Sequence, residues 1–318
     1  MQLKNNGKIN FVIDLFINFK DQMSGGLVAL HRLSYELAEK GHNVYIFCEP
    51  EYPHDNIHVI PCTTRIEGSR FYSSWEGFSY SSNNTVSIYT EHNLNNPFGT
   101  KHITRWILYH TKKEFEEQYS NNEYYFNYGG CFTYRGYNDG YLTTVDYNLD
   151  NFYIENNSNK RYGYCHILHK NTPTDGDEII KNFNSKDLGK NWFDNGGFDY
   201  LRQEFNKYEY FITFDQNTYL TTAAALCGCK SIILNPNHRD FDVKNAYTES
   251  RYYKEPLTPT EYRLGFPRNM FGVAYGIEDL KWAEDTIHLV RDHIIELEKI
   301  DKKTVDKFID FWNEKCYV

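Results

Sequence analysis

The stretch that decides the fold is residues 25–47, which have the sequence GGLVALHRLSYELAEKGHNVYIF. Its first part carries leucines at helical spacing, and Gly41 is placed to end that helix. Residues 43–47 and the preceding residues 9–16, INFVIDLF, are apolar runs with the length of buried strands. A strand, a helix and a second strand joined by short connections predict a βαβ unit, and therefore a parallel sheet. The apolar face of the helix consists of Leu27, Leu30, Leu33, Leu37 and Ala38.

The rest of the first half continues this pattern less regularly. We predict short strands at residues 57–60, 85–89, 124–128 and 141–145, and a helix that includes residues 103–109. Residues 148–160 are polar and rich in Asn, which predicts a linker.

The alternation of strands and helices starts again after this linker. Strands are predicted at residues 162–168, 210–214 and 231–234, and helices at 176–183, 197–207 and 218–226. A glycine-rich loop at 265–276 precedes a helical tail over 277–299 and 302–313. The tail has one apolar stripe, formed by Ile287, Val290, Ile294, Leu297 and Ile300.

These elements predict an α/β protein with two Rossmann-like, doubly wound domains that face a cleft, and with C-terminal helices. The expected domains are residues 1–150 and 151–318. Ligands of such folds bind at the carboxyl ends of the strands and in the cleft between domains.

Composition and charge narrow the function classes. The chain has 318 residues, and its 34 basic and 43 acidic side chains give a net charge of −9. Because nucleic-acid binding without sequence preference needs a basic surface, a nucleic-acid partner is not expected. No apolar run approaches about 18 residues, so no membrane span is expected, and the N-terminus lacks the pattern of a signal peptide. Seven scattered cysteines suit reduced thiols in a cytoplasmic compartment.

Candidate functional residues of the first half follow two predicted strands. Gly25 and Gly26 open the helix after the first strand, where the backbone can approach a ligand and the helix N-terminus attracts anions. Glu91 and His92 come just past the strand at 85–89, where a carboxylate or an imidazole can accept a proton from a hydroxyl group. A turn and a surface loop are the alternative interpretations of these two segments.

The second half carries the sharper candidates. Asp215, Asn217, Thr218 and Tyr219 lie between a strand and a helix of small residues, whose N-terminus predicts a phosphate site. Lys170 follows the strand at 162–168, and Arg161 precedes that strand as the second choice of cation. Ordinary packing of a βαβ unit is the alternative interpretation of the helix, and a solvated loop lysine is that of Lys170.

Two segments carry a resemblance to a known family. Residues 25–47, with Gly25, Gly26 and the Gly41-His42-x-Val44 step into a strand, resemble the N-terminal segment of GT-B glycosyltransferases. Residues 213–234 resemble the donor-binding segment of the same enzymes. One departure stands out, because Ala223 occupies the position where that family usually has the Glu that holds the donor ribose. The departure puts that ribose contact, and membership of the common retaining families, in doubt.

The resemblance implies an enzyme that moves a hexosyl or pentosyl group from a nucleotide-sugar donor to a hydroxyl of a glycan acceptor. It implies that Lys170, Asn217 and Thr218 hold the donor diphosphate and that Asp215 orients the donor. Glu91 or His92 is the base if the enzyme inverts. The terminal helices would return to the first domain.

No cofactor or metal ion is expected beyond the nucleotide sugar itself. GT-B enzymes usually stabilise the departing diphosphate with side chains and helix N-termini instead of a metal. Asp175-Gly-Asp177 has the D-x-D form of a metal-dependent transferase, but it lies in a predicted loop that opens a helix.

Two other functions remain open on the sequence. One is a different cleft enzyme on the same fold, such as a nucleotide-sugar epimerase or a phage-type transferase that glycosylates DNA bases. The other is a sugar-binding module without catalytic activity.

Overall fold

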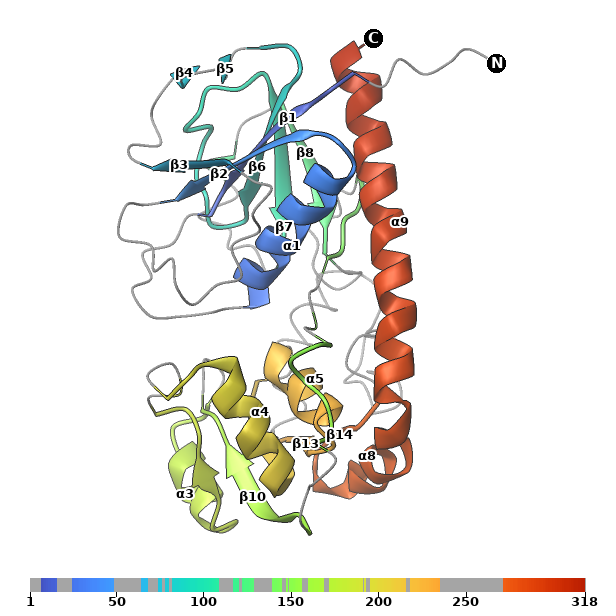
Figure 1. Ribbon diagram of the computed structural model, residues 1–318. Coiled ribbons are helices and arrows are strands. Elements are labelled where there is room, and N and C mark those ends of the chain that lie inside the picture. The colour runs from blue at the N-terminus through green and yellow to red at the C-terminus, as the bar shows by residue number, and fades with distance from the viewer. Residues whose placement is uncertain are drawn as a thin grey trace, which may run out of the picture. The chain divides into compact units, whose positions relative to one another are not determined.

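The computed structural model describes residues 7–15, 25–48, 64–67, 74–75, 78–79, 82–108, 117–119, 122–128, 139–144, 147, 149–155, 160–168, 172–190, 192, 195–215, 218–234 and 271–317. The chain divides into two compact units (Figure 1). The first consists of Met1–Val145 with Glu298–Val318, and the second of Asp146–Leu297. The expected boundary between residues 150 and 151 lies a few residues from this division, while the last turns of the C-terminal helix belong with the first unit.

The first unit is built on a seven-stranded sheet in the order β3-β2-β1-β6-β7-β8-β9, and all paired neighbours are parallel. Helix α1 (Gly25–Glu39) connects β1 to β2 and ends before Gly41, whose φ of 87° suits glycine. The predicted βαβ unit is therefore confirmed. The strands are β1 (Asn10–Asp14), β2 (Asn43–Cys48), β3 (Thr64–Glu67), β6 (Thr85–Thr90), β7 (His102–Ile107), β8 (Glu123–Asn127) and β9 (Gly140–Tyr141), and a separate antiparallel pair is formed by β4 (Ser74–Trp75) and β5 (Phe78–Ser79).

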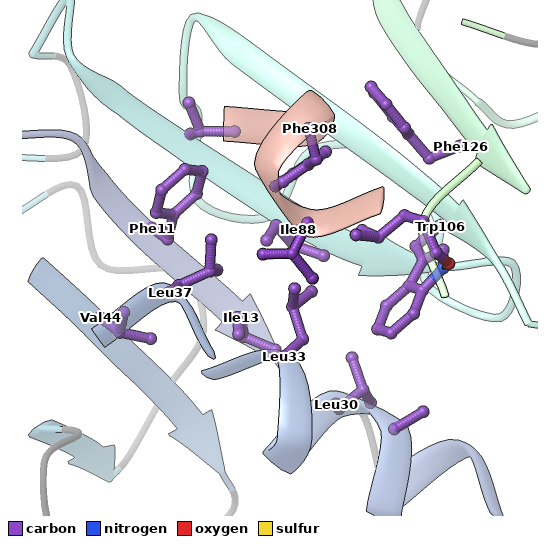
Figure 2. Packing of buried hydrophobic residues seen from close by; sticks show 14 of the residues in the cluster. Phe11, Ile13, Leu30, Leu33, Leu37, Val44, Ile88, Trp106, Phe126 and Phe308 are labelled. Carbon is purple, nitrogen blue, oxygen red and sulfur yellow. Dashed lines mark hydrogen bonds between the residues drawn. The ribbon is translucent and has the colours of Figure 1, made fainter. Parts of the chain in front are cut away.

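One face of this sheet carries the larger apolar core (Figure 2). Phe11 and Ile13 of β1 point to it, and the leucines of α1 cover it. Phe308 of helix α9 (Val290–Tyr317) lies in the same core, at 4.8 Å between ring centroids from Phe126 of β8. Burying each large apolar side chain contributes roughly 1.5–3 kcal/mol. The C-terminal part of α9 is thus an integral part of the first unit.

The helix predicted to include residues 103–109 is wrong, because His102–Ile107 forms strand β7. All six residues of β7 are buried. Trp106 enters the helix-covered core, whereas Arg105 faces the opposite side of the sheet beside Tyr89. Since both faces are covered, the alternation of polar and apolar residues that marks a strand is missing.

Three other predictions for the first unit need comment. The predicted strand at 57–60 lies outside the described residues, and the third strand of the βαβ region is β3. The strand at 124–128 is confirmed as β8. The strand predicted at 141–145 is reduced to β9, which covers two residues.

The second unit contains a five-stranded parallel sheet in the order β11-β10-β12-β13-β14. Its helices cover both faces: α3 and α8 pack against the face of Ile212 and Ile232, and α4 and α5 against the face of Phe211. The strands are β10 (Tyr162–His166), β11 (Lys186–Asp187), β12 (Tyr208–Thr213), β13 (Lys230–Ile233) and β14 (Val273–Tyr275), and the helices are α3 (Gly176–Lys181), α4 (Phe198–Lys207), α5 (Tyr219–Leu226) and α8 (Leu280–Thr286).

The three helices and the three strands predicted for this unit are confirmed as α3, α4, α5, β10, β12 and β13. Two predictions near the C-terminus are wrong. Part of the expected loop at 265–276 is strand β14. The tail is not two long helices: the short turns η2 (Ile277–Asp279) and η3 (Ile287–Leu289) flank α8, and α9 continues through residues 300–301 without a break. Ile300, which was placed on the apolar stripe, is 52% exposed.

The two sheets differ in strand order. When the short β4–β5 pair is set aside, the first sheet follows the dinucleotide-binding order 3-2-1-4-5-6 with β9 added as a seventh strand at the edge, and the second follows 2-1-3-4-5. Both are Rossmann-like arrangements of parallel strands.

Candidate functional site

In each sheet the strand order reverses at one point, and the carboxyl ends of two strands flank it. In the first sheet the reversal lies between β1 and β6, which end at Asp14 and Thr90. In the second sheet the reversal lies between β10 and β12, which end at His166 and Thr213. Open parallel sheets bind ligands outside the carboxyl ends of the strands at such points. Each unit therefore has one candidate site.

The first candidate site begins with a buried hydrogen-bonded group that joins β1 to the loop after β6. The Nδ2 atom of Asn93 donates to Oδ2 of Asp14 over 2.9 Å. The Oδ1 atom of Asn93 accepts from the backbone N and from Oγ1 of Thr90, at 2.8 and 2.9 Å. Asp14 is fully buried and Asn93 is 1% exposed. These contacts hold the two strand ends together.

Glu91 and His92 lie in this loop, as the sequence predicted, but they differ in exposure. The Glu91 carboxylate is buried, and its Oε2 accepts from the backbone N of Leu108 at 2.9 Å. The hydroxyl of Tyr119 donates to the backbone O of Glu91 over 2.6 Å. The side chain of His92 is 51% exposed, and its Nε2 lies 3.3 Å from Oε1 of Glu91. The buried carboxylate of Glu91 therefore lies next to the half-exposed imidazole of His92.

Arg105 of β7 completes this site, although the sequence placed it on a helix and assigned it no role. Its side chain is fully buried. The Nε and Nη2 atoms bind the two carboxylate oxygens of Glu123 at 2.8 and 2.7 Å, a bidentate pair. The remaining N–H groups donate to backbone carbonyls at the end of β6 and in the loop that follows it. Those carbonyls belong to Thr90, Asn93 and Asn95.

Two tyrosine rings enclose this guanidinium. Its central carbon lies 4.4 Å from the ring centroid of Tyr119 and 5.2 Å from that of Tyr89. Aromatic faces attract a guanidinium, especially away from water. Strand register is the signal that brings Arg105 and Glu123 together: Arg105 pairs with Tyr125 between β7 and β8, which puts it on the same face as Glu123. Because residues 103–109 were predicted to form a helix, no strand register could be predicted for Arg105.

Gly25 and Gly26 open helix α1, which follows β1 in the chain. Gly25 is the first residue of the helix, as expected. The residues between β1 and α1, 16–24, lie outside the described residues. The helix N-terminus offers backbone N–H groups and a partial positive charge for an anion or a hydroxyl oxygen.

In the second unit, Asp215 and Thr218 follow β12. The backbone N of Asp215 donates to Oγ1 of Thr213 over 3.1 Å, which holds the strand end. Thr218 is the N-cap of α5: its Oγ1 accepts from the backbone N of Leu220 at 3.3 Å. Helix α5 is buried along most of its length and packs closely on the sheet, with Oγ of Ser231 donating to the backbone O of Thr221 over 2.8 Å.

Tyr219 belongs to an aromatic cluster of the second unit. Its ring is stacked on that of Tyr147 at 6.4 Å and lies 6.1 Å from Phe152 and 5.9 Å from Phe198. The contacts described for Tyr219 are therefore packing contacts. Lys170 and Asn217, two of the predicted donor-binding residues, lie outside the described residues.

Arg161, the second predicted cation, lies at the amino end of β10, which is the edge of the sheet opposite to the candidate site. Its guanidinium donates to the backbone O atoms of Phe205 and Tyr208, at 2.6 and 3.2 Å, and to that of Cys227. It also binds Oδ1 of Asn206 at 3.2 Å. Arg161 thus closes the C-terminal ends of α4 and α5, where a cation is favourable, and we leave it out of the proposed donor site.

The sequence did not single out His166, which ends β10 beside the second reversal. Its Nδ1 lies 2.8 Å from Oγ of Ser185, and its Nε2 lies 3.9 Å from Oδ1 of Asp187. Burial lowers the pKa of His166 below its ordinary value, while Asp187 and Asp177 act in the opposite direction. The imidazole is therefore a neutral, oriented hydrogen-bonding group at neutral pH.

Within the described ranges no group of three His, Cys, Asp or Glu side chains is placed to hold a metal ion. Of the helices that the structure describes, none is long and apolar enough to cross a membrane. Cys165, Cys227 and Cys229 are buried free thiols, and burial raises the pKa of Cys227 to about 12.

No protein-family model matches the chain, and no curated protein sequence matches it.

Proposed function

We propose that this protein is a GT-B glycosyltransferase, which moves a sugar from a nucleotide-sugar donor to a hydroxyl group of a glycan acceptor. The observation that carries the proposal is the occurrence, in one chain, of two parallel sheets that each place a carboxylate at the reversal of strand order. The carboxylate belongs to Asp14 in the first sheet and to Asp215, just after β12, in the second. The two resemblances in the sequence fall on these same two regions.

The second unit is the proposed donor side. The N-terminus of α5 carries a partial positive charge of about half an elementary charge, which favours the donor diphosphate. Thr218 stabilises that helix end as its N-cap. Asp215, which lies between β12 and this N-cap, is the residue proposed to orient the donor. Lys170 and Asn217 are proposed partners of the diphosphate on the sequence argument. No metal ion has a part in this proposal.

The first unit is the proposed acceptor side. Gly25 and Gly26 supply the start of α1, and the loop of residues 90–96 supplies Glu91 and His92. Carboxylates, amides and imidazoles bind hydroxyl groups by hydrogen bonds, and of these the carboxylates and imidazoles can also deprotonate them.

The test is incubation of the protein with UDP-, GDP- and dTDP-sugars, with thermal shift and donor hydrolysis as the two readouts. We expect at least one donor to stabilise the protein and to be hydrolysed slowly in the absence of an acceptor. If no nucleotide sugar shifts the melting temperature, the proposed function is wrong. Binding without turnover points to a sugar-binding module, and transfer to DNA instead of a glycan points to a base-modifying transferase.

Two lysine variants locate the donor site. Lys170→Ala is expected to weaken donor binding about tenfold or more, because a charge-assisted hydrogen bond to the diphosphate is lost. Lys281→Ala is the matched control: Lys281 is an exposed lysine of the same unit, 2.8 Å from Asp285 on α8. An unchanged donor affinity in Lys170→Ala would remove the phosphate assignment and leave the rest of the proposal standing.

A further inference from the structure

The second unit has a groove at the edge of its sheet opposite to the candidate site. Residues 149–150 and 153–154, the C-terminal end of α5 and the residues around the start of α9 line it, and its volume is about 440 Å³. Small-molecule sites span roughly 300–1,000 Å³. Helix α5 begins after the carboxyl end of β12 and ends before the amino end of β13, so the groove and the candidate site lie at opposite ends of this helix. The residues described as lining the groove all belong to the second unit.

The floor of the groove is apolar. It is formed by Ala225 and Leu226 of α5 and by Val290 of α9, all of which are buried. Gly272, just before β14, packs closely against this floor: a Cβ atom there would lie 3.0 Å from Cβ of Ala225 and from Cγ2 of Val290. The floor is therefore well packed on its protein side, and a ligand in the groove meets an apolar surface.

Two apolar side chains at the wall of the groove stay exposed. Tyr153 is 37% exposed and Ile154 is 57% exposed. Contacts with α4 hold the backbone that carries them: Nδ2 of Asn206 donates to the backbone O of Tyr153 over 2.9 Å, and its Oδ1 accepts from the backbone N of Glu155 at 3.0 Å. Arg202 donates to the hydroxyl of Tyr153 and lies 5.1 Å from the centroid of its ring. Exposed apolar side chains that gather beside polar groups are typical of binding surfaces.

The mouth of the groove carries charges of both signs. Nη1 of Arg291 donates to the backbone O of Leu149 over 3.2 Å, which places the guanidinium beside the peptide group that joins Leu149 to Asp150. Arg291 and Asp150 are both exposed, and neither forms an ion pair with any residue that the structure describes. His288 lines the same mouth. A cation and an anion that lie close together without pairing are complementary to a ligand that carries both charges.

We propose that this groove binds a small zwitterion with an apolar body, specifically an apolar α-amino acid. The carboxylate of the ligand binds Arg291, whose planar guanidinium suits a carboxylate, and the ammonium group binds Asp150. The side chain of the ligand lies on the apolar floor, beside Tyr153 and Ile154. The proposal does not depend on the proposed function, because no sugar or nucleotide takes part and the groove lies away from the N-terminus of α5.

Charge decides between this class of ligand and its neighbours. A fatty acid brings a negative head group next to Asp150, and an alkylamine brings a positive one next to Arg291; like charges disfavour binding in both cases. An uncharged apolar molecule gains nothing from either side chain. A phosphocholine head group is a zwitterion of the same kind from a different source, so the experiment includes it.

The first experiment titrates the full chain with L-phenylalanine and measures binding by calorimetry and by ligand-observed NMR. We expect a Kd of about 1 mM or tighter. Three analogues each lack one feature: N-acetyl-L-phenylalanine has no ammonium group, L-phenylalanine amide has no carboxylate, and L-serine has no apolar side chain. Each analogue is expected to bind at least about tenfold more weakly, because one charged or apolar contact is lost.

The second experiment assigns each contact to a residue. Asp150→Asn is expected to weaken binding of L-phenylalanine about tenfold and to leave binding of the N-acetyl analogue unchanged, because that analogue has no ammonium group to lose. Arg291→Gln is expected to have the same effect on L-phenylalanine and none on the amide, while Arg291→Lys keeps the preference for a carboxylate. Ile154→Ser is expected to weaken binding of all three compounds. These three residues are exposed, so the variants are expected to fold, which circular dichroism checks.

Lys281→Gln and Asp285→Asn are the matched controls. They change an exposed ion pair of 2.8 Å on α8 in the same unit, and neither residue is among those described as lining the groove. Both controls are expected to bind L-phenylalanine like the wild type.

Four results would overturn the proposal. One is no binding of L-phenylalanine up to about 10 mM, and another is equal affinity for either analogue that lacks a charge. Binding that survives both Asp150→Asn and Arg291→Gln takes place elsewhere on the protein. Tighter binding of monomeric n-hexylphosphocholine than of L-phenylalanine assigns the groove to a lipid head group instead of an amino acid.

Discussion

Arg105 in the first unit and Arg161 in the second do similar chemistry at opposite edges of their sheets. Each spreads one guanidinium over several backbone carbonyls. Arg105 reaches the loop at the carboxyl ends of the strands and is neutralised by Glu123, with no exposure of either side chain. Arg161 closes two helix ends at the amino edge. The comparison teaches that the edge of the sheet at which an arginine lies, and not its residue type, decides whether it borders a candidate site.

The largest effect is expected from Arg105→Met. This change leaves Glu123 as a buried charge without its bidentate partner and frees three loop carbonyls, which should cost about 3–5 kcal/mol of the free energy of unfolding. Hydrogen exchange followed by mass spectrometry should show the loss in residues 85–108 and 122–128. A loss below about 1 kcal/mol would mean that the pair does not hold the loop.

Arg161→Met is expected to cost less, about 1–3 kcal/mol, because the carbonyls at the ends of α4 and α5 are partly open to water once the side chain is removed. The loss should appear in the second unit, as faster exchange at residues 198–208 and 219–229. A weaker donor affinity in Arg161→Met, with an unchanged fold, would contradict our removal of Arg161 from the donor site.

Thr218→Ala sharpens the comparison on the donor side. Loss of the N-cap of α5 should cost about 1 kcal/mol and should weaken binding of the donor diphosphate at the same helix end. Thr218→Ser keeps the capping oxygen and is the control, with a stability expected near that of the wild type. Chemical denaturation and donor titration measure the two effects, and equal behaviour of both variants would disprove the capping role.

The smallest effect concerns the pH dependence of the two units. Burial lowers the pKa of His102 in the first unit and of His166 in the second below the ordinary value of 6.5, and Lys101 adds to the effect at His102. The unfolded chain therefore binds these protons more readily than the folded one, so stability is present above pH 6.5 and decreases as the pH falls below it.

The two histidines should act on separate units. His102→Gln is expected to flatten the acid-side decrease in hydrogen-exchange protection of the first unit alone, and His166→Gln that of the second. An acid-side decrease that is the same in both variants and in the wild type would show that other groups set the pH dependence, such as carboxylates or His42, whose pKa burial also lowers.

Local patterns were enough for much of the fold. The leucine face of α1, the glycine after it and the apolar run of β2 each lie within a few residues, and periodicity detects such elements directly. The same holds for Thr218 as the start of α5. Strand β7 was not predicted because both of its faces are buried. Its sequence therefore lacks the alternation of polar and apolar residues by which a strand with one exposed face is recognised.

The candidate site was predictable only in part. Glu91 and His92 follow a strand end in the sequence, and that position alone pointed to function. Their different exposures could not be predicted, because they depend on Leu108, Tyr119 and Arg105, which come from other strands and loops. Arg161 shows the opposite case: it precedes β10 in the chain and so lies at the amino end of the strand, and only the structure shows that its guanidinium binds the carbonyls at the ends of α4 and α5.

The sequence by itself determined two successive sets of parallel strands with helices between them, and it located the strand ends at which polar residues gather. These are consequences of local periodicity, helix ends and short connections. Only the tertiary structure decided the strand orders, the point within α9 at which the chain passes into the first unit, and the meeting of Arg105 with Glu123 behind His92. The physical reason is that register and burial arise between segments far apart in the chain, where no local pattern records which side chains will face one another.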